Sequence, residues 1–346
     1  MKRLLLFISI TTSFGASQAQ NLTKNETREI VHKVRQLIRK HYVIPDLAKQ
    51  IDQQLQENFQ ANKYQSLNNY AQLAKAITTD LQSLTQDGHL YLKYNKGYQK
   101  NTQKPKRRRG AQGHGGHGPT DEMFNRFRNK QGKFFEAKVL EGNIGYLNIP
   151  VFPSLHLCQQ EIEAAMKKLS QCEALIFDVQ SCPGGEGESM TFLAGYLFAQ
   201  RTKLNYYFRK KQPKRTSYTR KVPGKTMPKI PVYILTSKKT FSAGESFAFY
   251  LQQLNRAKIV GIKTRGGGRA NMLFTLNPEL MLSVSVSRSI SAVTGKGFQG
   301  VGVVPDIPTE ASKAKKIAQL NALMYIIQQN PSKKTQLSPF IKKLKN

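Results

Sequence analysis

The amino-terminal part of the chain carries apolar residues at helical spacing. Thr23 and Glu26 stand three residues apart, which is the spacing of a capping box, and Pro45 later interrupts the pattern. Three apolar stripes follow, each on one helical face: Ile30, Val31, Val34, Leu37 and Ile38; Leu47, Ile51, Leu55 and Phe59; and Leu73, Ile77, Leu81 and Leu84. Residues 22–94 are therefore predicted to form a bundle of three amphipathic helices that ends in the strand-like stretch "DGHLYLKY".

From Phe134 onward the pattern changes to short apolar runs that alternate with helical stretches. The runs "NIGYLNIPVF", "ALIFDV" and "PVYILT" predict strands, and "AKIVGI" and "LMLSVSVSRSI" add further ones. Between them, "CQQEIEAAMKKLSQ", "GESMTFLAGYLFAQ" and "AGESFAFYLQQL" predict helices. Strands that are apolar throughout and alternate with helices are typical of parallel sheets covered on both faces. Residues 134–330 are therefore expected to form an α/β core with a mainly parallel sheet.

Three other stretches complete the expected organisation. Residues 1–19 have a basic start, a short apolar run and small residues at Ser17 and Ala19, which is typical of a secretory signal peptide. Residues 95–133 are predicted to be a basic, Gly-rich linker or loop, and residues 331–346 a basic C-terminal tail. The chain is thus expected to be exported, to the periplasm or the medium.

Composition adds a strong positive charge. The 346 residues include 54 Lys and Arg against 21 Asp and Glu, a formal charge of +33. Such an excess attracts polyanions or an anionic envelope surface, and the run Lys104–Arg109 is the expected contact. No aromatic residues are interleaved for base stacking, so specific nucleic-acid binding is not expected. Mean hydropathy is −0.48, and no transmembrane segment is expected after signal cleavage.

The cysteines and most histidines do not suggest a metal or redox site. Cys158, Cys172 and Cys182 are too few for a disulfide framework, and at least two are expected to be small buried apolar residues. His114 and His117 lie in the Gly-rich stretch, where "HGGH" alone cannot close a metal site. No metal or cofactor is therefore expected.

Two loops that join a buried strand to a helix carry residues suited to acyl transfer. "QSCPGGEGES" contains Gly184 and Gly185, and "SKKTFSAGES" contains Ser242. Such loops meet at the carboxyl edge of a parallel sheet, where reacting groups gather. A Gly-Gly pair can point backbone N–H groups into one space, and the N–H after a nucleophilic serine completes an oxyanion hole. Taken singly, however, Ser242 is better explained as a helix N-cap and the glycines as a tight turn.

Six motifs in a fixed order favour the chemical interpretation. They are "DGH" at 87–89, "IGYL" at 144–147, "FDVQSCPGG", "TFSAGE" at 240–245, "GIKTRGGG" and "GVGVVPDI". Together they resemble the carboxy-terminal-processing and tricorn-core serine peptidases, above all the branch with the modules of interphotoreceptor retinoid-binding protein. The resemblance implies a crotonase/Clp-like protease core with a mainly parallel sheet, preceded by a small N-terminal three-helix bundle. No PDZ-like stretch is evident between the two.

The resemblance also implies roles for matched residues. Ser242 would be the nucleophile, and the N–H of Ala243 with that of Gly184 or Gly185 would form the oxyanion hole. The processing-protease branch uses a lysine where this chain has Gly267, so the usual Ser–Lys pair is not available. The tricorn-like branch uses a histidine, matched here by His89, whose neutral imidazole can take the serine proton.

Departures from the family pattern concern the partner of that histidine. Gln299 stands where retinoid-binding-type modules commonly have a glutamate, and an amide orients an imidazole without stabilising the imidazolium. The sequence thus predicts either lower turnover or the participation of another acid, Glu186 or Glu245, and does not choose between them. Gln180 and Cys182 also replace the usual arginine and asparagine after the strand, which changes the local packing.

Three functions are compatible with these features. The first is an exported serine endopeptidase that cleaves unfolded or tail-exposed polypeptides through an acyl-enzyme, favoured by the presence of both Ser242 and His89. The second is a catalytically weak or inactive module that binds an apolar ligand or a protein, favoured by Gln299. The third is a polyanion-binding protein dominated by its basic segment, whose binding would depend steeply on salt.

Overall fold

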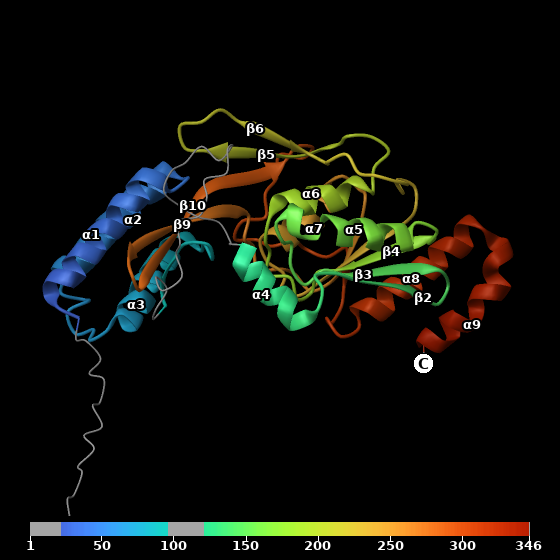
Figure 1. Ribbon diagram of the computed structural model, residues 1–346, viewed down its shortest axis with the longest axis horizontal. Coiled ribbons are helices and arrows are strands. Elements are labelled where there is room, and N and C mark those ends of the chain that lie inside the picture. The colour runs from blue at the N-terminus through green and yellow to red at the C-terminus, as the bar shows by residue number, and fades with distance from the viewer. Residues whose placement is uncertain (1–21, 96–120, 346) are drawn as a thin grey trace, which may run out of the picture.

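The fold is built on two β-sheets with helices packed around them (Figure 1). The structure is a computed structural model that describes residues 22–95 and 121–345. The predicted signal peptide 1–19 lies outside the described residues, as do Lys104–Arg109, His114 and His117.

The first sheet has six strands in the order β11-β8-β7-β4-β3-β2, and every pair is parallel except β2 with β3. Its strands are β2 (Glu136–Leu140), β3 (Ile144–Asn148), β4 (Ala174–Asp178), β7 (Val232–Thr236), β8 (Lys258–Gly261) and β11 (Ile307–Pro308). Residues of β4 alternate between two cores: Leu175 and Phe177 pack on one face, Ala174 and Ile176 on the other. This is why the strand is apolar throughout.

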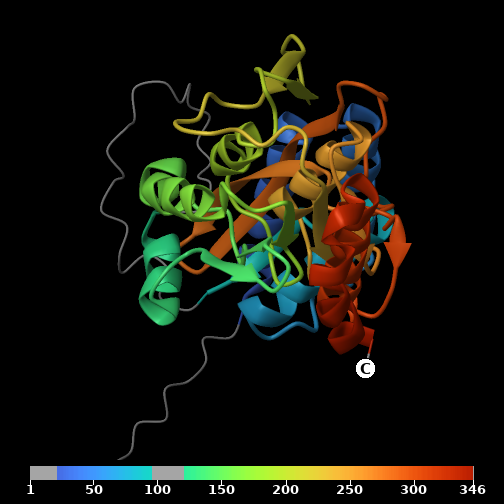
Figure 2. The ribbon, with the colours of Figure 1, turned by 90° about the vertical axis from the view of Figure 1, so that its right-hand side faces the viewer.

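Helices cover both faces of this sheet. One face carries α5 (Leu155–Leu169), α6 (Gly187–Gly195) and α7 (Ala243–Gln253), and the other carries α8 (Ala314–Gln329) and α9 (Lys334–Lys345). Figure 2 shows α8 and α9 in red on the opposite side of the sheet from the green α5. The carboxyl ends of β4 and β7 open toward the starts of α6 and α7, which places their two loops at one edge.

The second sheet is antiparallel and was not anticipated as a separate layer. Its path is β1-β10-β5-β6, with β9 pairing β10 along the other side. The strands are β1 (Tyr91–Tyr94), β5 (Lys203–Arg209), β6 (Arg215–Tyr218), β9 (Arg269–Asn277) and β10 (Leu280–Ser291). The long strand β10 turns its apolar residues to one face and its serines to the other, because side chains alternate along a strand.

The amino-terminal helices pack on the apolar face of β10. They are α1 (Lys24–His41), α2 (Pro45–Gln60) and α3 (Tyr70–Thr85). Thr23 and Glu26 form the predicted capping box, with the Thr23 Oγ1 accepting from the Glu26 N–H at 3.2 Å. The core of the bundle includes Leu282 and Val284 of β10, so these helices share their apolar interior with strands from the other end of the chain.

Two segments differ from the sequence-based interpretation. Within the stretch 95–133, residues Asp121–Gln131 form helix α4 instead of a linker. The predicted tail 331–346 forms a short 3-10 helix (Pro331–Lys333) followed by α9, in which Leu337 is 3% exposed and packs into the core beside α8. Its apolar residues recur at helical spacing, but the many lysines around them suggested a solvated tail. Within 22–95 and 121–345, no helix is both long and apolar enough to cross a membrane.

Candidate active site

The two loops after β4 and β7 lie against each other, as the topology predicted. The Phe241 N–H donates to the Cys182 carbonyl at 2.9 Å, and the Thr240 hydroxyl donates to the Val179 carbonyl at 2.9 Å. A Cβ added to Gly184 would lie 3.2 Å from the Ser242 Oγ. The glycine loop therefore passes directly beside the serine hydroxyl.

Ser242 has an unusual backbone conformation at the start of α7. Its φ of 53° and ψ of −117° lie outside the regions that L-residues populate freely, so the turn is strained. Strain of this kind persists only where neighbouring contacts fix the backbone, and it presents the side chain at the edge of the sheet. Ser242 is thus held in a strained, half-buried turn between β7 and α7.

Glu245 provides much of that fixation. Its fully buried carboxylate accepts hydrogen bonds from the Ser242 N–H at 2.9 Å, the Thr264 hydroxyl at 2.5 Å and the N–H groups of Gly266 and Gly267 at 2.5 and 2.7 Å. Burial raises the pKa of Glu245, and these four donors oppose the increase. Since its oxygens are engaged with the serine loop and the 264–267 loop, Glu245 acts here as a structural tie.

Three amide groups around Ser242 are available as donors. Gly184 and Gly185 have φ values of +117° and +129°, which favour glycine, and a Cβ on Gly185 would lie 1.9 Å from the Phe152 carbonyl oxygen. Among the described residues no hydrogen bond uses the N–H of Gly184, Gly185 or Ala243. A Cβ on Gly184 would come 3.2 Å from the Ala243 nitrogen, so the glycine loop and the helix start face the same space. Such an arrangement can stabilise an oxyanion.

His89 reaches this loop through an aromatic stack. It follows α3 in a turn in which the His89 N–H donates to Asp87 Oδ1 at 3.1 Å and the Ser283 hydroxyl donates to the His89 carbonyl. Its ring stacks on Phe241 with centroids 4.5 Å apart and planes at 25°. Because Phe241 immediately precedes Ser242, the imidazole lies beside the serine loop, although no hydrogen bond joins it to Ser242 in the described structure.

The imidazole of His89 is buried and neutral. Only 6% of the residue is exposed, and burial lowers the pKa of His89 to about 4, with Arg265 and Arg269 acting in the same direction and Asp87 against them. Within residues 22–95 and 121–345, its buried Nδ1 atom has no hydrogen-bond partner. A neutral ring can accept a proton at neutral pH, but a base with this pKa holds the proton weakly.

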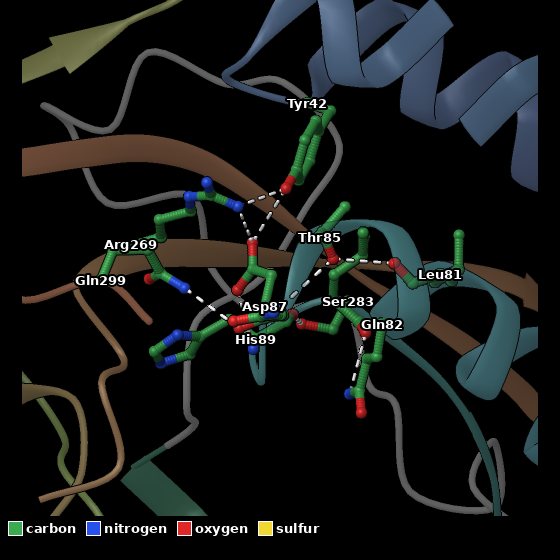
Figure 3. A network of polar contacts seen from close by, with 11 residues as sticks. Tyr42, Leu81, Gln82, Thr85, Asp87, His89, Arg269, Ser283 and Gln299 are labelled. Atoms are coloured by element: carbon green, nitrogen blue, oxygen red, sulfur yellow. Dashed lines mark hydrogen bonds and ion pairs between the residues drawn. The ribbon is translucent and has the colours of Figure 1, made fainter. Parts of the chain in front are cut away.

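A charged network that the sequence did not suggest holds the histidine turn. Asp87 is fully buried and pairs with Arg269 of β9 at 2.9 Å, and the Tyr42 hydroxyl donates to Asp87 at 3.2 Å (Figure 3). Arg269 also contacts the Tyr42 hydroxyl. The acid of "DGH" was visible in the sequence, but nothing there indicated its partners, which lie 45 and 182 residues away.

Gln299, which lies 213 residues further along the chain than Gln86, contacts the same turn. Its Nε2 donates to the Gln86 carbonyl at 3.4 Å (Figure 3). Its buried Oε1 has no hydrogen-bond partner among the residues that the structure describes. Neither of the other candidate acids approaches His89 through a hydrogen bond among the described residues: Glu245 is engaged as above, and Glu186 lies at the N-cap of α6. Burial raises the pKa of Glu186.

Phe241 occupies the space in which a lysine at position 267 would begin. A Cβ on Gly267 would lie 2.2 Å from the Phe241 Cε2, and Arg265 lies with its guanidinium carbon 4.5 Å from the centroid of the same ring. A side chain at 267 therefore requires Phe241 to move. The geometry agrees with the absence of a lysine there and leaves His89 as the titratable side chain stacked beside the serine loop.

The other positions singled out in the sequence, Gln180 and the three cysteines, make packing and hydrogen-bond contacts. Gln180 donates to the Ala311 carbonyl at 2.7 Å. Cys182 packs directly against Gly244, because a Cβ added to Gly244 would lie only 3.1 Å from the Cys182 sulfur. Cys158, Cys172 and Cys182 are buried and unpaired, and burial raises the pKa of each thiol. No group of three or more His, Cys, Asp or Glu residues suited to a metal occurs within the described ranges.

Two family profiles match the chain. The profile of peptidase family S41 matches residues 143–309, which include Ser242 and both glycines, and a second profile, described as the N-terminal domain of Peptidase_S41 in eukaryotic IRBP, matches residues 17–127, which include His89. The chain belongs to peptidase family S41, and the resemblance read from its six motifs is confirmed.

Curated relatives match about half of the chain. A carboxyl-terminal-processing protease of Synechocystis sp. is 26% identical over 166 residues, 47% of this chain and 37% of the relative. A carboxy-terminal-processing protease of Bartonella bacilliformis is 26% identical over 185 residues, 51% of this chain and 41% of the relative. The matched part is thus less than half the length of either relative.

Solved structures share the fold at low sequence identity. A lipoprotein from Streptococcus agalactiae has a TM-score of 0.56 at 17% identity, covering 85% of this chain and 94% of its own. The photosystem II D1 C-terminal processing protease has 0.52 at 15%, covering 82% and 93%, and the tricorn protease 0.53 at 16%, covering 93% and 37%. The predicted α/β protease core preceded by a three-helix bundle is confirmed.

Proposed function

We propose that this chain is an exported serine endopeptidase that cleaves unfolded or tail-exposed polypeptides, with His89 instead of a lysine as its base. The observation that carries the proposal is the strained Ser242 elbow, which lies beside three amide donors and directly follows the ring on which His89 stacks. Family membership and the names of the curated relatives support peptide-bond hydrolysis. The basic and apolar pattern of residues 1–19 supports export.

The proposed reaction forms and breaks an acyl-enzyme. His89 takes the Ser242 hydroxyl proton as the Oγ attacks the substrate carbonyl carbon. The resulting oxyanion accepts hydrogen bonds from the N–H of Ala243 and from that of Gly184 or Gly185. Collapse of the intermediate expels the amine, to which His89 returns the proton, and a water molecule activated by the same imidazole then hydrolyses the ester.

The amide of Gln299 has a defined part in this scheme. Its Nε2 contact to Gln86 places it beside the histidine turn, where its unpartnered Oε1 can accept a hydrogen bond from an imidazolium. An amide carries no charge to stabilise that cation, so turnover should be lower than with a carboxylate in the same place.

Labelling with a fluorophosphonate tests the proposal. Wild type should be labelled covalently, Ser242→Ala should not, and His89→Ala should react at least about 100-fold more slowly. A folded wild type that is not labelled would remove the peptidase function, whereas a labelled His89→Ala would remove only the assigned base. Circular dichroism of each variant verifies folding.

A second function is favoured by a specific pair of observations. The base has a pKa of about 4, and an uncharged glutamine stands where related modules have an acid. Both fit a weak or inactive member that binds an apolar ligand or a protein. Absence of labelling, together with binding that is unchanged in Ser242→Ala, would support this alternative.

A further inference from the structure

A cavity of about 600 Å³ lies beside the first turn of α6, next to the glycine loop. Its lining includes Gly187, Arg201, Tyr207, Tyr218, Arg220 and Lys221. The residues come from the start of α6, from β5 and β6 and from the segments flanking that hairpin. Figure 1 shows this hairpin extending above α6. Nothing in the proposed reaction uses this cavity.

The cavity is close to the proposed reacting groups. Gly187 is three residues beyond Gly184, and three residues span at most about 10 Å. A Cβ on Gly184 would lie 3.2 Å from the Ser242 Oγ, and one on Gly187 would lie 3.7 Å from the Tyr207 hydroxyl. Since an extended peptide rises about 3.3 Å per residue, the edge of the cavity at Gly187 is within reach of a side chain about three residues from the cleaved bond.

The chain around the cavity is basic even for this protein. Between Ser189 and Gly244 there are thirteen Lys and Arg and no Asp or Glu, although the whole chain has 21 acidic residues. This acid-free stretch runs from α6 to the serine elbow and contains the hairpin β5–β6. The only carboxylate lining the cavity is that of Glu188, whose nearest oxygen is 3.4 Å from Arg220.

One cation at the cavity, Arg201, is held in place without being neutralised. The Arg201 guanidinium lies 4.0 Å from the centre of the Tyr218 ring, which restricts it while leaving its N–H groups free. Among the described residues no carboxylate pairs with Arg201 or Lys221. Tyr207 adds a phenolic hydroxyl beside Gly187. A guanidinium on an aromatic ring, an ammonium group and a phenol are typical donors to a carboxylate.

We infer that this cavity is a subsite that binds a carboxylate of the polypeptide substrate, through Arg201 and Lys221. The inference rests on the proposed peptidase function and names its preferred substrates: chains with an acidic group about three residues from the cleaved bond. The carboxylate can come from an Asp or Glu side chain or from the chain terminus, and the experiment separates these sources.

Cleavage of internally quenched peptides tests the subsite. A series places Glu or Gln at each of four positions on either side of the cleaved bond, with the C-terminus either free or amidated. Wild type should cleave the best Glu peptide about 10-fold faster in kcat/KM than its Gln partner. In Arg201→Gln/Lys221→Gln the ratio should fall to about 2. If the carboxylate comes from the chain terminus, wild type should instead cleave the peptide with a free C-terminus faster than its amidated partner, and the double variant should lose this preference.

A matched control separates a subsite from general attraction. Lys225→Gln/Lys229→Gln removes the same charge from the same acid-free stretch without altering the cavity lining and should keep the wild-type ratio. If the Glu/Gln ratio falls equally in both double variants, or if wild type shows no preference for a carboxylate, the subsite is wrong. The peptidase function still stands in that case, provided that neutral peptides are cleaved and that the cleavage depends on Ser242. If no peptide is cleaved and fluorophosphonate does not label Ser242, both proposals fall together.

Discussion

The serine and histidine ends of the candidate site are built in opposite ways. At the serine end, Glu245 lies three residues from Ser242, and its oxygens accept four hydrogen bonds. At the histidine end, the buried Nδ1 of His89 and Oε1 of Gln299 have no partner in the part of the chain that the structure describes. A fully bonded carboxylate fixes the proposed nucleophile in advance, whereas the surroundings of the proposed base keep unsatisfied polar groups. The comparison teaches that stability at neutral pH should depend on the first end, whereas the response to pH and the tuning of the proposed reaction should depend on the second.

The largest effect is expected where the serine end is broken. Glu245→Gln replaces one acceptor oxygen by an NH₂ group that faces backbone N–H donors, and leaves them unsatisfied in a buried place. The free energy of unfolding should fall by about 3 kcal/mol. Urea unfolding measures this, and Glu310→Gln on an exposed loop should change it by no more than about 0.5 kcal/mol. Equal effects would mean that the carboxylate is not the tie described.

The next effect concerns stability at acid pH and belongs to the histidine end. The pKa of His89 is about 4 in the folded chain, against 6.5 for an unperturbed histidine, so below pH 6.5 the unfolded state binds the extra proton first. Stability from this group is therefore present above pH 6.5 and is lost between pH 6.5 and pH 4, by about 3 kcal/mol in total.

Urea unfolding at pH 7.5 and pH 4.5 reveals that loss by comparison with His89→Gln, which cannot titrate. Wild type should lose more stability than the variant across this range. His32→Gln, on the exposed side of α1, should behave like wild type. A wild type and His89→Gln with the same pH dependence would show that the imidazole is not buried as described.

A negative charge introduced at the histidine end should increase the rate at which fluorophosphonate labels Ser242. Gln299→Glu places a carboxylate where the amide now contacts the Gln86 carbonyl, and a negative charge there should stabilise the imidazolium of the proposed reaction. Fluorophosphonate labelling should become about 10-fold faster. Gln299→Met keeps the length without the charge and should not accelerate labelling. A rate that does not rise in Gln299→Glu would separate Gln299 from the reaction.

The smallest effect is a shift in the pH profile of labelling. Arg265 is exposed and lowers the pKa of His89, so Arg265→Gln should move the acid limb to higher pH by about 0.5 unit. Added salt should produce a similar shift in wild type and little in the variant. Lys263→Gln, its exposed neighbour in sequence, serves as the control. An unshifted limb in Arg265→Gln would assign that limb to a group other than His89.

The elements and the loop that carries Ser242 could be predicted from local sequence. Helical stripes, apolar runs and the order of the six motifs depend on residues a few positions apart, and so does the Thr23–Glu26 capping box. The neighbouring loops after β4 and β7 were also predictable, because parallel strands end at one edge. The hairpin β5–β6 was missed because its many basic residues resemble those of a solvated loop.

The sequence by itself determined which segments are helices and strands, which serine follows a buried strand, and which motifs place the chain in its family. Only the tertiary structure decided that Asp87 pairs with Arg269, that Gln299 contacts Gln86, and that Phe241 fills the space above Gly267. The ring of Phe241 also contacts both His89 and Arg265. These contacts join residues up to 213 positions apart. The periodicity of a segment reports which face is buried, but not which distant segment covers it.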